Sequence, residues 1–158
     1  MQLTNDFLIA ERACSDGLAW FTEHFGDAAD YQAVLDRLAQ ENKCDWADWL
    51  LNAVGPIDAA MELTGEAAIT GHLFVAGTLK CSASLSVSLS IKAGRGIEAG
   101  WGIKAGEGIE AGEDFGIYCG LRIKISTHAT YAVVTAKTEP RNILTGTYRS
   151  INIDTDQK

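Results

Sequence analysis

The stretch IKAGRGIEAGWGIKAGEGIEAGEDFGIYCG, from Ile91 to Gly120, contains nine glycines and nearly repeats itself. Such a stretch is a flexible linker, a phosphate-binding glycine loop or a structural repeat. Isoleucine returns at every sixth position from Ile91 to Ile109, which is not typical of a flexible linker. The glycine spacing differs from that of a dinucleotide-binding loop, and no long helix follows it. We therefore interpret the stretch as a structural repeat.

The repeat has a period of six and runs through nine rows, from Leu73 to Ser126. In each row the third position is apolar, and the second is Lys, Ser, Glu or Arg in most rows. Because strand side chains alternate, positions one and three share a face and position two points away. Stacked rows would bury both apolar columns inside a β-solenoid. The first column is large and apolar throughout: Leu73, Leu79, Leu85, Ile91, Ile97, Ile103, Ile109, Phe115 and Leu121.

The charges in the second column indicate how many rows make one coil. In a two-sided coil, positions twelve apart stack, so lysine would meet lysine and glutamate would meet glutamate. In a three-sided coil, positions eighteen apart stack, and most charges meet an opposite charge, which stabilises neighbouring strands. The resulting pairs are Lys80 with Glu98, Lys92 with Glu110 and Arg95 with Glu113, and only Lys104 with Arg122 is unfavourable. We expect a triangular β-helix of about three coils.

Residues 1–56 have helical periodicity and form a predicted helical head. Apolar residues recur at i, i+3, i+4 and i+7 in YQAVLDRLAQEN and again in DWADWLLNAVGP, and SDGLAWFTEHF has a third apolar stripe. We expect three or four short helices, with Asp27 and Asp30 as caps or first-turn acids of one, Asp45 as the cap of another and either Ser15 or Asp16 as the cap of a third. Gly55 and Pro56 should end the last helix. The candidate core aromatics are Trp20, Phe21, Tyr31, Trp46 and Trp49.

The remaining chain divides into residues 57–126, the hexad-repeat solenoid with its lead-in strands, and residues 127–158, a β-strand cap or arm with a frayed tail. TYAVVTAKT and NILTGTYRSINI are rich in β-branched and aromatic residues and flank the turn EPRN. They are expected to form either a closing hairpin or an arm that reaches a second subunit. The predicted fold class is α+β: a small helical bundle, then a triangular β-helix with a C-terminal hairpin or arm.

Composition and charge limit the classes of function. The net charge is −8, and residues 1–57 alone hold ten acidic and three basic residues. Such an acidic surface disfavours direct nucleic-acid binding and suits a basic partner. No apolar run is long enough to span a bilayer and no signal peptide is recognised, so we expect a cytoplasmic protein. The four cysteines lack paired spacing and are interpreted as small buried residues rather than zinc ligands.

We expect a partner-binding surface on the solenoid rather than a catalytic centre. Trp101 lies in a GWG corner, where we expect it to be exposed, and Trp is enriched in interface hot spots. The alternative is that Trp101 packs on the helical head or on the C-terminal hairpin. The other candidate partner-binding residues carry the ordered charges of the repeat, and the face that binds is left open: Arg95, Glu98, Lys104, Glu107 and Glu110.

Nothing in the sequence predicts an enzyme. There is no Ser/His/Asp arrangement, no pair of carboxylates at a catalytic spacing and no metal cluster, so no catalytic residue, cofactor or metal is expected. His24 lies in the predicted head, whereas His72 and His128 lie at the two ends of the repeat. An acyltransferase that uses one of them as a general base is a less favoured alternative.

Two segments carry a resemblance to known proteins. ACSDGLAWF at Ala13–Phe21, together with the IEAG and IKAG rows, resembles a group of uncharacterised bacterial and phage proteins with a helical head and a hexad solenoid. The hexads also resemble, more distantly, the left-handed hexapeptide acyltransferases and the bactofilins, which polymerise end to end. The acyltransferases carry their small residue before the aliphatic one, so handedness stays open, and bactofilins lack a helical head.

The resemblance implies a fold and a narrower hypothesis about function. A phage-like origin and an acidic head suggest an inhibitor that occludes a host defence complex, as anti-CRISPR proteins do. A self-assembling scaffold is the alternative, because open β-helix ends are potential pairing edges. On that basis we expect a homodimer or trimer and no membrane partner.

Overall fold

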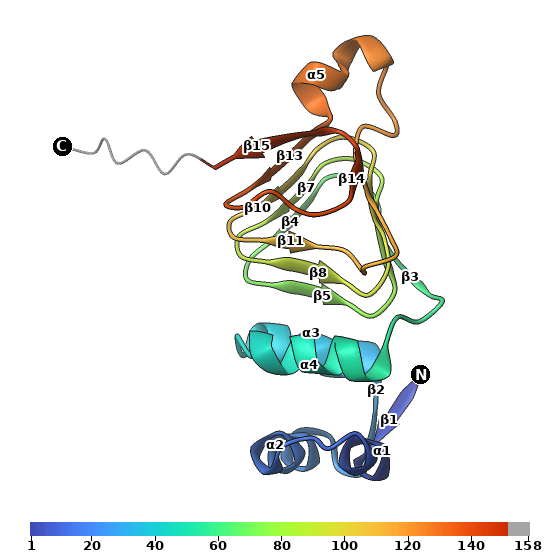
Figure 1. Cartoon of the computed structure of the whole chain (residues 1–158), viewed down its shortest axis with the longest axis vertical. Coiled ribbons are helices and arrows are strands. Elements are labelled where there is room, and N and C mark those ends of the chain that lie inside the picture. Colours follow the sequence, from blue (N-terminus) through green and yellow to red (C-terminus); the bar gives the residue numbers. More distant parts are fainter. Residues whose placement is uncertain (152–158) are drawn as a thin grey trace, which may run out of the picture. The chain divides into compact units, whose positions relative to one another are not determined.

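The computed structural model describes residues 1–151 (Figure 1). The chain separates into two units, Met1–Gly55 and Pro56–Lys158. The first is helical and the second is a β-solenoid, as the sequence predicts. The predicted frayed tail, DTDQK, and the last two residues of the predicted strand segment NILTGTYRSINI lie outside the described residues.

The helical unit contains four helices and one short antiparallel strand pair. The helices are α1 (Asn5–Ala10), α2 (Ser15–Phe25), α3 (Tyr31–Gln40) and α4 (Cys44–Val54). Strands β1 (Gln2–Thr4) and β2 (Ala28–Asp30) pair in antiparallel register. The core of the unit includes Phe21, Tyr31, Leu35 and Leu50, each at most 3% exposed.

The helix ends show which predicted caps were correct. The carboxylate of Asp30 accepts hydrogen bonds from the backbone N–H groups of Gln32 and Ala33, which confirms Asp30 as the N-cap of α3. Gly55, at φ 78°, ends α4 as predicted. The other two caps were placed wrongly: Cys14 caps α2 through its sulfur, and α4 follows Lys43 with Asp45 in its first turn. Cys14 is also exposed, contrary to the expectation that the cysteines are buried.

The solenoid is a triangular prism of three parallel sheets, whose outline is visible in Figure 1. One sheet has the strand order β14-β12-β9-β6-β3, the second β15-β13-β10-β7-β4 and the third β11-β8-β5. Two sheets therefore rise through about five coils, more than the three expected. The strands are β3 (Ala60–Leu63), β4 (Ala67–Ile69), β5 (Leu73–Val75), β6 (Thr78–Cys81), β7 (Leu85–Val87), β8 (Ile91–Ala93), β9 (Ile97–Ala99), β10 (Ile103–Ala105), β11 (Ile109–Glu110), β12 (Ile117–Tyr118), β13 (Val133–Ala136), β14 (Ile143–Thr145) and β15 (Thr147–Ser150).

The register confirms the three-sided coil. Lys80 lies beside Glu98 and Lys92 beside Glu110, each eighteen positions apart. The Lys92 Nζ and a carboxylate oxygen of Glu110 are 3.6 Å apart. The inward columns are buried as predicted, and Ile91, Ile97, Ile103 and Ile109 are at most 3% exposed.

The GxG corners are explained by close contact between coils rather than by unusual backbone angles. A Cβ atom on Gly106 would overlap the backbone carbonyl oxygen of Ser88, one coil below. Gly108, two positions later, has no such neighbour. Neither residue has a positive φ. The first glycine of this corner is therefore required by the close stacking of the coils.

The repeat loses its six-residue phase after Ile109, so two predicted rows are wrong. Ile117, not Phe115, pairs with Ile97, which is a shift of two positions. The row that begins at Leu121 is not a strand at all: the chain leaves the stack at Gly120 and forms η1 (Ile125–Thr127) and α5 (His128–Tyr131). Figure 1 shows this segment projecting from the triangular outline. The predicted contact of Lys104 with Arg122 is consequently wrong, because Thr135 occupies that position.

The C-terminal strands continue the prism instead of forming a hairpin. Strand β14 pairs in parallel with β12, and β15 pairs in parallel with β13. Parallel pairing excludes the closing hairpin that the sequence favoured as one alternative. Strands β14 and β15 are separated by Gly146 alone, at φ 116°, where the chain turns from one sheet to the next.

Candidate functional site

One corner of the solenoid gathers exposed aromatic and aliphatic side chains. It begins at Trp101, between β9 and β10, where the backbone carbonyl of Trp101 accepts a hydrogen bond of 2.7 Å from the N–H of Gly120. The N–H of Arg122 donates to the carbonyl of Gly100 at 2.9 Å. These bonds fix the point, directly beside Trp101, at which the chain leaves the stack of coils and begins the projecting segment Leu121–Tyr131.

Tyr131, at the end of α5, returns to the same corner. Its ring meets the indole of Trp101 edge-on, with ring centroids 5.0 Å apart and an interplanar angle of 65°. Trp101 is 39% exposed and Tyr131 is 46% exposed. Trp101 is thus partly exposed although it packs against another ring. Its aromatic partner comes from the projecting segment, and the hairpin named in the alternative does not exist.

The projecting segment, Leu121–Tyr131, adds two more exposed apolar side chains and two cations. Leu121 is 52% and Ile125 is 87% exposed. Arg122 and Lys124 are exposed as well, and the segment contains no acidic residue. We call Trp101, Leu121, Ile125 and Tyr131 the apolar corner. Large apolar side chains gathered at one place on a surface mark interaction sites, whereas scattered ones do not.

The other predicted site residues do not join Trp101. Arg95 lies at a different corner, where its guanidinium is 2.6 Å from a carboxylate oxygen of Asp58 and lies over the ring of Phe115. No ion pair between Arg95 and Glu113 is found among residues 1–151. Arg95 and Glu98 do come together, since both line an open groove of about 490 Å³ that also includes Tyr118.

The three remaining residues lie on other faces of the prism. Lys104 points outward from β10, between Ser86 and Thr135. Glu107, at the third corner, accepts a hydrogen bond of 3.0 Å from the Ser90 hydroxyl. Glu110 lies on the β11 face beside Lys92. The six predicted residues therefore lie around the whole prism and do not form one surface.

The helical unit has its own apolar groove, of about 320 Å³. The residues that line it come from all four helices and from the loop between α1 and α2. Three of the lining side chains are indoles. Arg12 is the only charged residue among the lining side chains. We call this hollow the head groove. It is lined by Leu8, Arg12, Ala13, Cys14, Gly17, Trp20, Phe21, Val34, Leu38, Trp46, Trp49 and Leu50.

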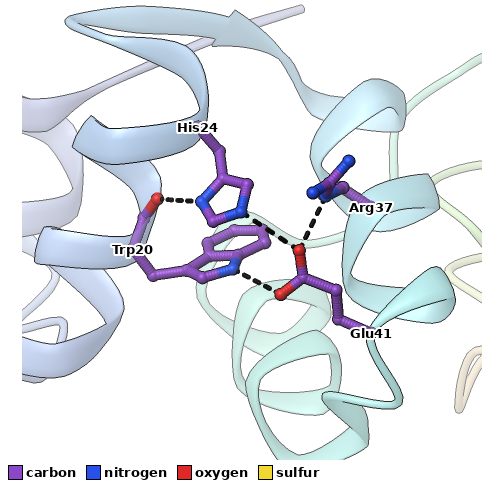
Figure 2. A network of polar contacts seen from close by, with 4 residues as sticks. All are labelled: Trp20, His24, Arg37 and Glu41. Carbon is purple, nitrogen blue, oxygen red and sulfur yellow. Dashed lines mark hydrogen bonds and ion pairs between the residues drawn. The ribbon is translucent and has the colours of Figure 1, made fainter.

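Beside the groove, a polar network ties α2 to the end of α3 (Figure 2). The Trp20 indole N–H donates to one carboxylate oxygen of Glu41 at 2.8 Å, and Arg37 Nε donates to the other at 2.7 Å. His24 Nε2 is 3.1 Å from Glu41, while its Nδ1 is 2.8 Å from the Trp20 carbonyl oxygen. Hydrogen bonds from Trp20 and then Arg37 lower the pKa of Glu41.

The three histidines lie in different surroundings. His24 is held in the network of Glu41, and the ring of His72 stacks on that of Phe74 with centroids 5.3 Å apart. His128 begins the short helix α5. Among residues 1–151, no group of three or more His, Cys, Asp or Glu side chains is arranged to hold a metal ion. No helix in that part of the chain has the length and apolar character needed to cross a bilayer.

The sequence did not reveal the apolar corner, because LRIKIS fits the hexad pattern. One signal was present. The three rows directly before it close with two glycines, as in AGEG, whereas the row from Ile109 closes with AGED. The end of this run of glycine pairs coincides with the corner where the phase changes. No comparable signal predicted the head groove. Helical periodicity shows which residues share a helix face, but it does not show whether neighbouring helices pack tightly or leave a groove between them.

Comparison with known proteins identifies only the helical unit. Residues 1–54 match the model of the YdhT N-terminal domain family. The match ends one residue before the boundary between the two units and covers no part of the solenoid. No curated protein and no solved structure matches the chain. The head is thus similar to a recurring domain, and the comparison gives no activity.

Proposed function

We propose that the chain is a non-enzymatic β-solenoid scaffold that binds a protein partner through the apolar corner. The observation that carries the proposal is the exposed Trp101–Tyr131 pair, together with the exposed Leu121 and Ile125 on the same projecting segment as Tyr131. Trp and Tyr are the residues most enriched in interface hot spots, where they present a large rigid surface. Exposed apolar side chains that lie together on a surface mark interaction sites, because a partner that covers them removes their apolar area from water.

The solenoid favours this role because it holds the corner in place. The backbone bonds of Gly120 to Trp101 and of Arg122 to Gly100 attach the projecting segment to the stacked coils. A surface that is already ordered loses less conformational entropy on binding, so more of the contact energy contributes to affinity. The rigid prism is therefore a suitable frame for recognition of a partner.

The cations of the projecting segment define the partner's chemistry. The exposed Leu121 and Ile125 flank Arg122 and Lys124 in the sequence, and the segment holds no acidic residue. The best match is an apolar protein surface edged by carboxylates. Two cations in a chain of net charge −8 give little attraction to a nucleic acid or an anionic membrane. We propose no cofactor and no bound metal.

We also propose a cytoplasmic location. All four cysteines, including the exposed Cys14, are free thiols. An exposed free thiol is better suited to a reducing compartment than to an oxidising one, where disulfides form and persist.

A photo-crosslinking amino acid at Ile125 tests the proposed function. In an extract of the organism that encodes the chain, it should attach to one discrete protein, and the Trp101→Ala substitution should abolish the product. The same crosslinker at Leu144, equally apolar and 60% exposed on β14, is the matched control. Equal crosslinking from both positions, or none from Ile125, would overturn the proposal.

The identity of the crosslinked protein separates two narrower hypotheses. Recovery of a subunit of a host defence complex would support the inhibitor hypothesis that follows from the phage resemblance. Recovery of the chain itself would support the self-assembling scaffold.

A further inference from the structure

The head groove and the projecting segment have complementary chemistry. The groove is apolar, with three indoles among its walls. It belongs to a unit in which residues 1–57 carry ten acidic and three basic side chains. The projecting segment has the opposite character, since it presents apolar side chains on either side of two cations and has no carboxylate. An apolar groove on a domain of net negative charge can receive a short basic and apolar segment.

The size of the groove fits the side chains of the projecting segment. A carbon group occupies about the volume of a water molecule, ~30 Å³, so an Ile or Leu side chain of four carbons needs about 120 Å³. A groove of about 320 Å³ therefore has room for two such side chains. Leu121 and Ile125 are the two most exposed aliphatic side chains of the segment, and they are four positions apart.

We propose that the partner bound by the apolar corner is a second copy of this chain, whose head groove receives Leu121 and Ile125. This inference rests on the proposed function and names its partner. The charge complementarity favours the head groove over a membrane, because the same cations would meet about seven excess negative charges on a head. Two cations oppose this attraction locally: Arg12 in the groove wall, and Lys43, whose Nζ lies 4.2 Å from the ring centroid of the lining residue Trp46.

The geometry of such a contact has a consequence for assembly. The two surfaces are different, so the contact is heterologous, and a pair of copies still has one free groove and one free segment. Heterologous contacts produce closed rings when the rotation closes and open filaments when it does not. Growth should therefore continue with protein concentration, and added salt should weaken it because exposed charges contribute.

Complementary variants of the full chain test this directly. Ile125→Asp should disable the segment, and Ala13→Arg should fill the groove wall with a bulky cation that repels Arg122 and Lys124. We expect wild-type protein to exceed the mass of one chain in light scattering, increasingly so at higher concentration. Each variant alone should be monomeric. An equimolar mixture should form a heterodimer and stop there, because only one intact groove and one intact segment remain to meet.

Two matched controls show that the effect is local. Ile9→Asp changes an exposed apolar residue of α1 that does not line the groove, and Leu144→Asp changes one on β14; each is 60% exposed. Both should assemble as wild type does. Circular dichroism and thermal melting establish that all the variants fold.

Cys14 gives a second measurement that needs no substitution in the groove. It lines the groove and is exposed, whereas Cys81 and Cys119 are buried. Alkylation of Cys14 should slow several-fold as wild-type protein is concentrated, and it should not slow in Ile125→Asp. A bulky maleimide attached to Cys14 should keep the folded chain monomeric.

The outcomes distinguish the inference from the proposed function. A wild-type chain that stays monomeric, or a mixture of the two variants that stays monomeric, overturns the head-groove contact. If the crosslinker at Ile125 then still captures a different protein in a Trp101-dependent manner, the proposed function stands with another partner. If Ile125 is instead needed for binding to anionic lipid vesicles by a monomeric chain, both proposals are overturned.

Discussion

The ring of Tyr131 meets the indole of Trp101 edge-on, with centroids 5.0 Å apart, although thirty positions separate the two residues in the sequence. Trp101 belongs to a regular GWG corner of the repeat, and Tyr131 belongs to the segment that interrupts the repeat one coil later. The interruption is therefore attached to the solenoid through an aromatic contact. This contact joins the regular six-residue repeat to the segment that departs from it.

Removing this aromatic pair should cost little stability and abolish binding. Aromatic pairs contribute about 0.5–1.5 kcal/mol beyond their buried area, and both rings are partly exposed. Trp101→Ala and Tyr131→Ala should each lower the free energy of unfolding by about 1 kcal/mol in urea titrations. The double variant should lose less than the sum of the two, because the contact can be lost only once. A strictly additive double variant would show that the rings do not stabilise each other.

The corner glycines of one row should differ sharply in their tolerance of alanine. Gly106→Ala places a Cβ atom on the carbonyl oxygen of Ser88, so the stacked coils must move apart. Overpacking of this kind costs about 1–3 kcal/mol. Gly108→Ala is the matched control, because nothing lies within 4 Å of its Cβ position, and it should be neutral or stabilise by about 0.4–1 kcal/mol. Urea unfolding measures both, and equal losses would contradict the close-stacking explanation.

The sequence predicted the prism well wherever the eighteen-residue period holds. Between Leu73 and Ile109, each strand lies on another copy of the same row pattern, so the inward columns and the charge ladder are fixed by periodicity alone. The prediction failed after Ile109 for a physical reason. Alternating apolar residues in LRIKIS satisfy the strand pattern, but the pattern does not show whether a strand below accepts them. Gly120, at φ 77°, turns the chain out of the stack instead.

The candidate site was less predictable than the fold. Trp101 was identified because the repeat gives it no inward role, and it is indeed exposed. Ile125 fell at the corner that closes the last predicted row, and Tyr131 fell in a predicted hairpin or arm, so the segment that carries both could not be anticipated. The head groove depends on how closely four helices pack, which is set by side-chain shape rather than by the helical period.

Reversing one charge of the ladder should destabilise the solenoid slightly. Glu110→Lys places two cations side by side on neighbouring strands, since Lys92 is the in-register neighbour of Glu110. We expect a loss of about 0.2–1 kcal/mol in the free energy of unfolding. Combining it with Lys92→Glu should restore stability, because the pair is then reversed rather than broken. Lys104→Glu is the control, as its neighbours Ser86 and Thr135 are uncharged.

The Glu41 network should make the helical unit sensitive to acid. The pKa of Glu41 is lowered from 4.5 in the folded chain, chiefly by the hydrogen bonds from Trp20 and Arg37. A lowered folded-state pKa means that the stabilisation is fully present above the unfolded value and is lost as the pH falls through the folded value. Glu41→Gln should therefore melt at a lower temperature than wild type at neutral pH, and the difference in melting temperature should shrink as the pH falls below about 4.5.

Glu23→Gln, at an exposed carboxylate of α2, is the control and should follow wild type throughout. Melting followed by circular dichroism across this pH range provides the measurement, and a gap between Glu41→Gln and wild type that persists at low pH would show that the network does not depend on an ionised Glu41.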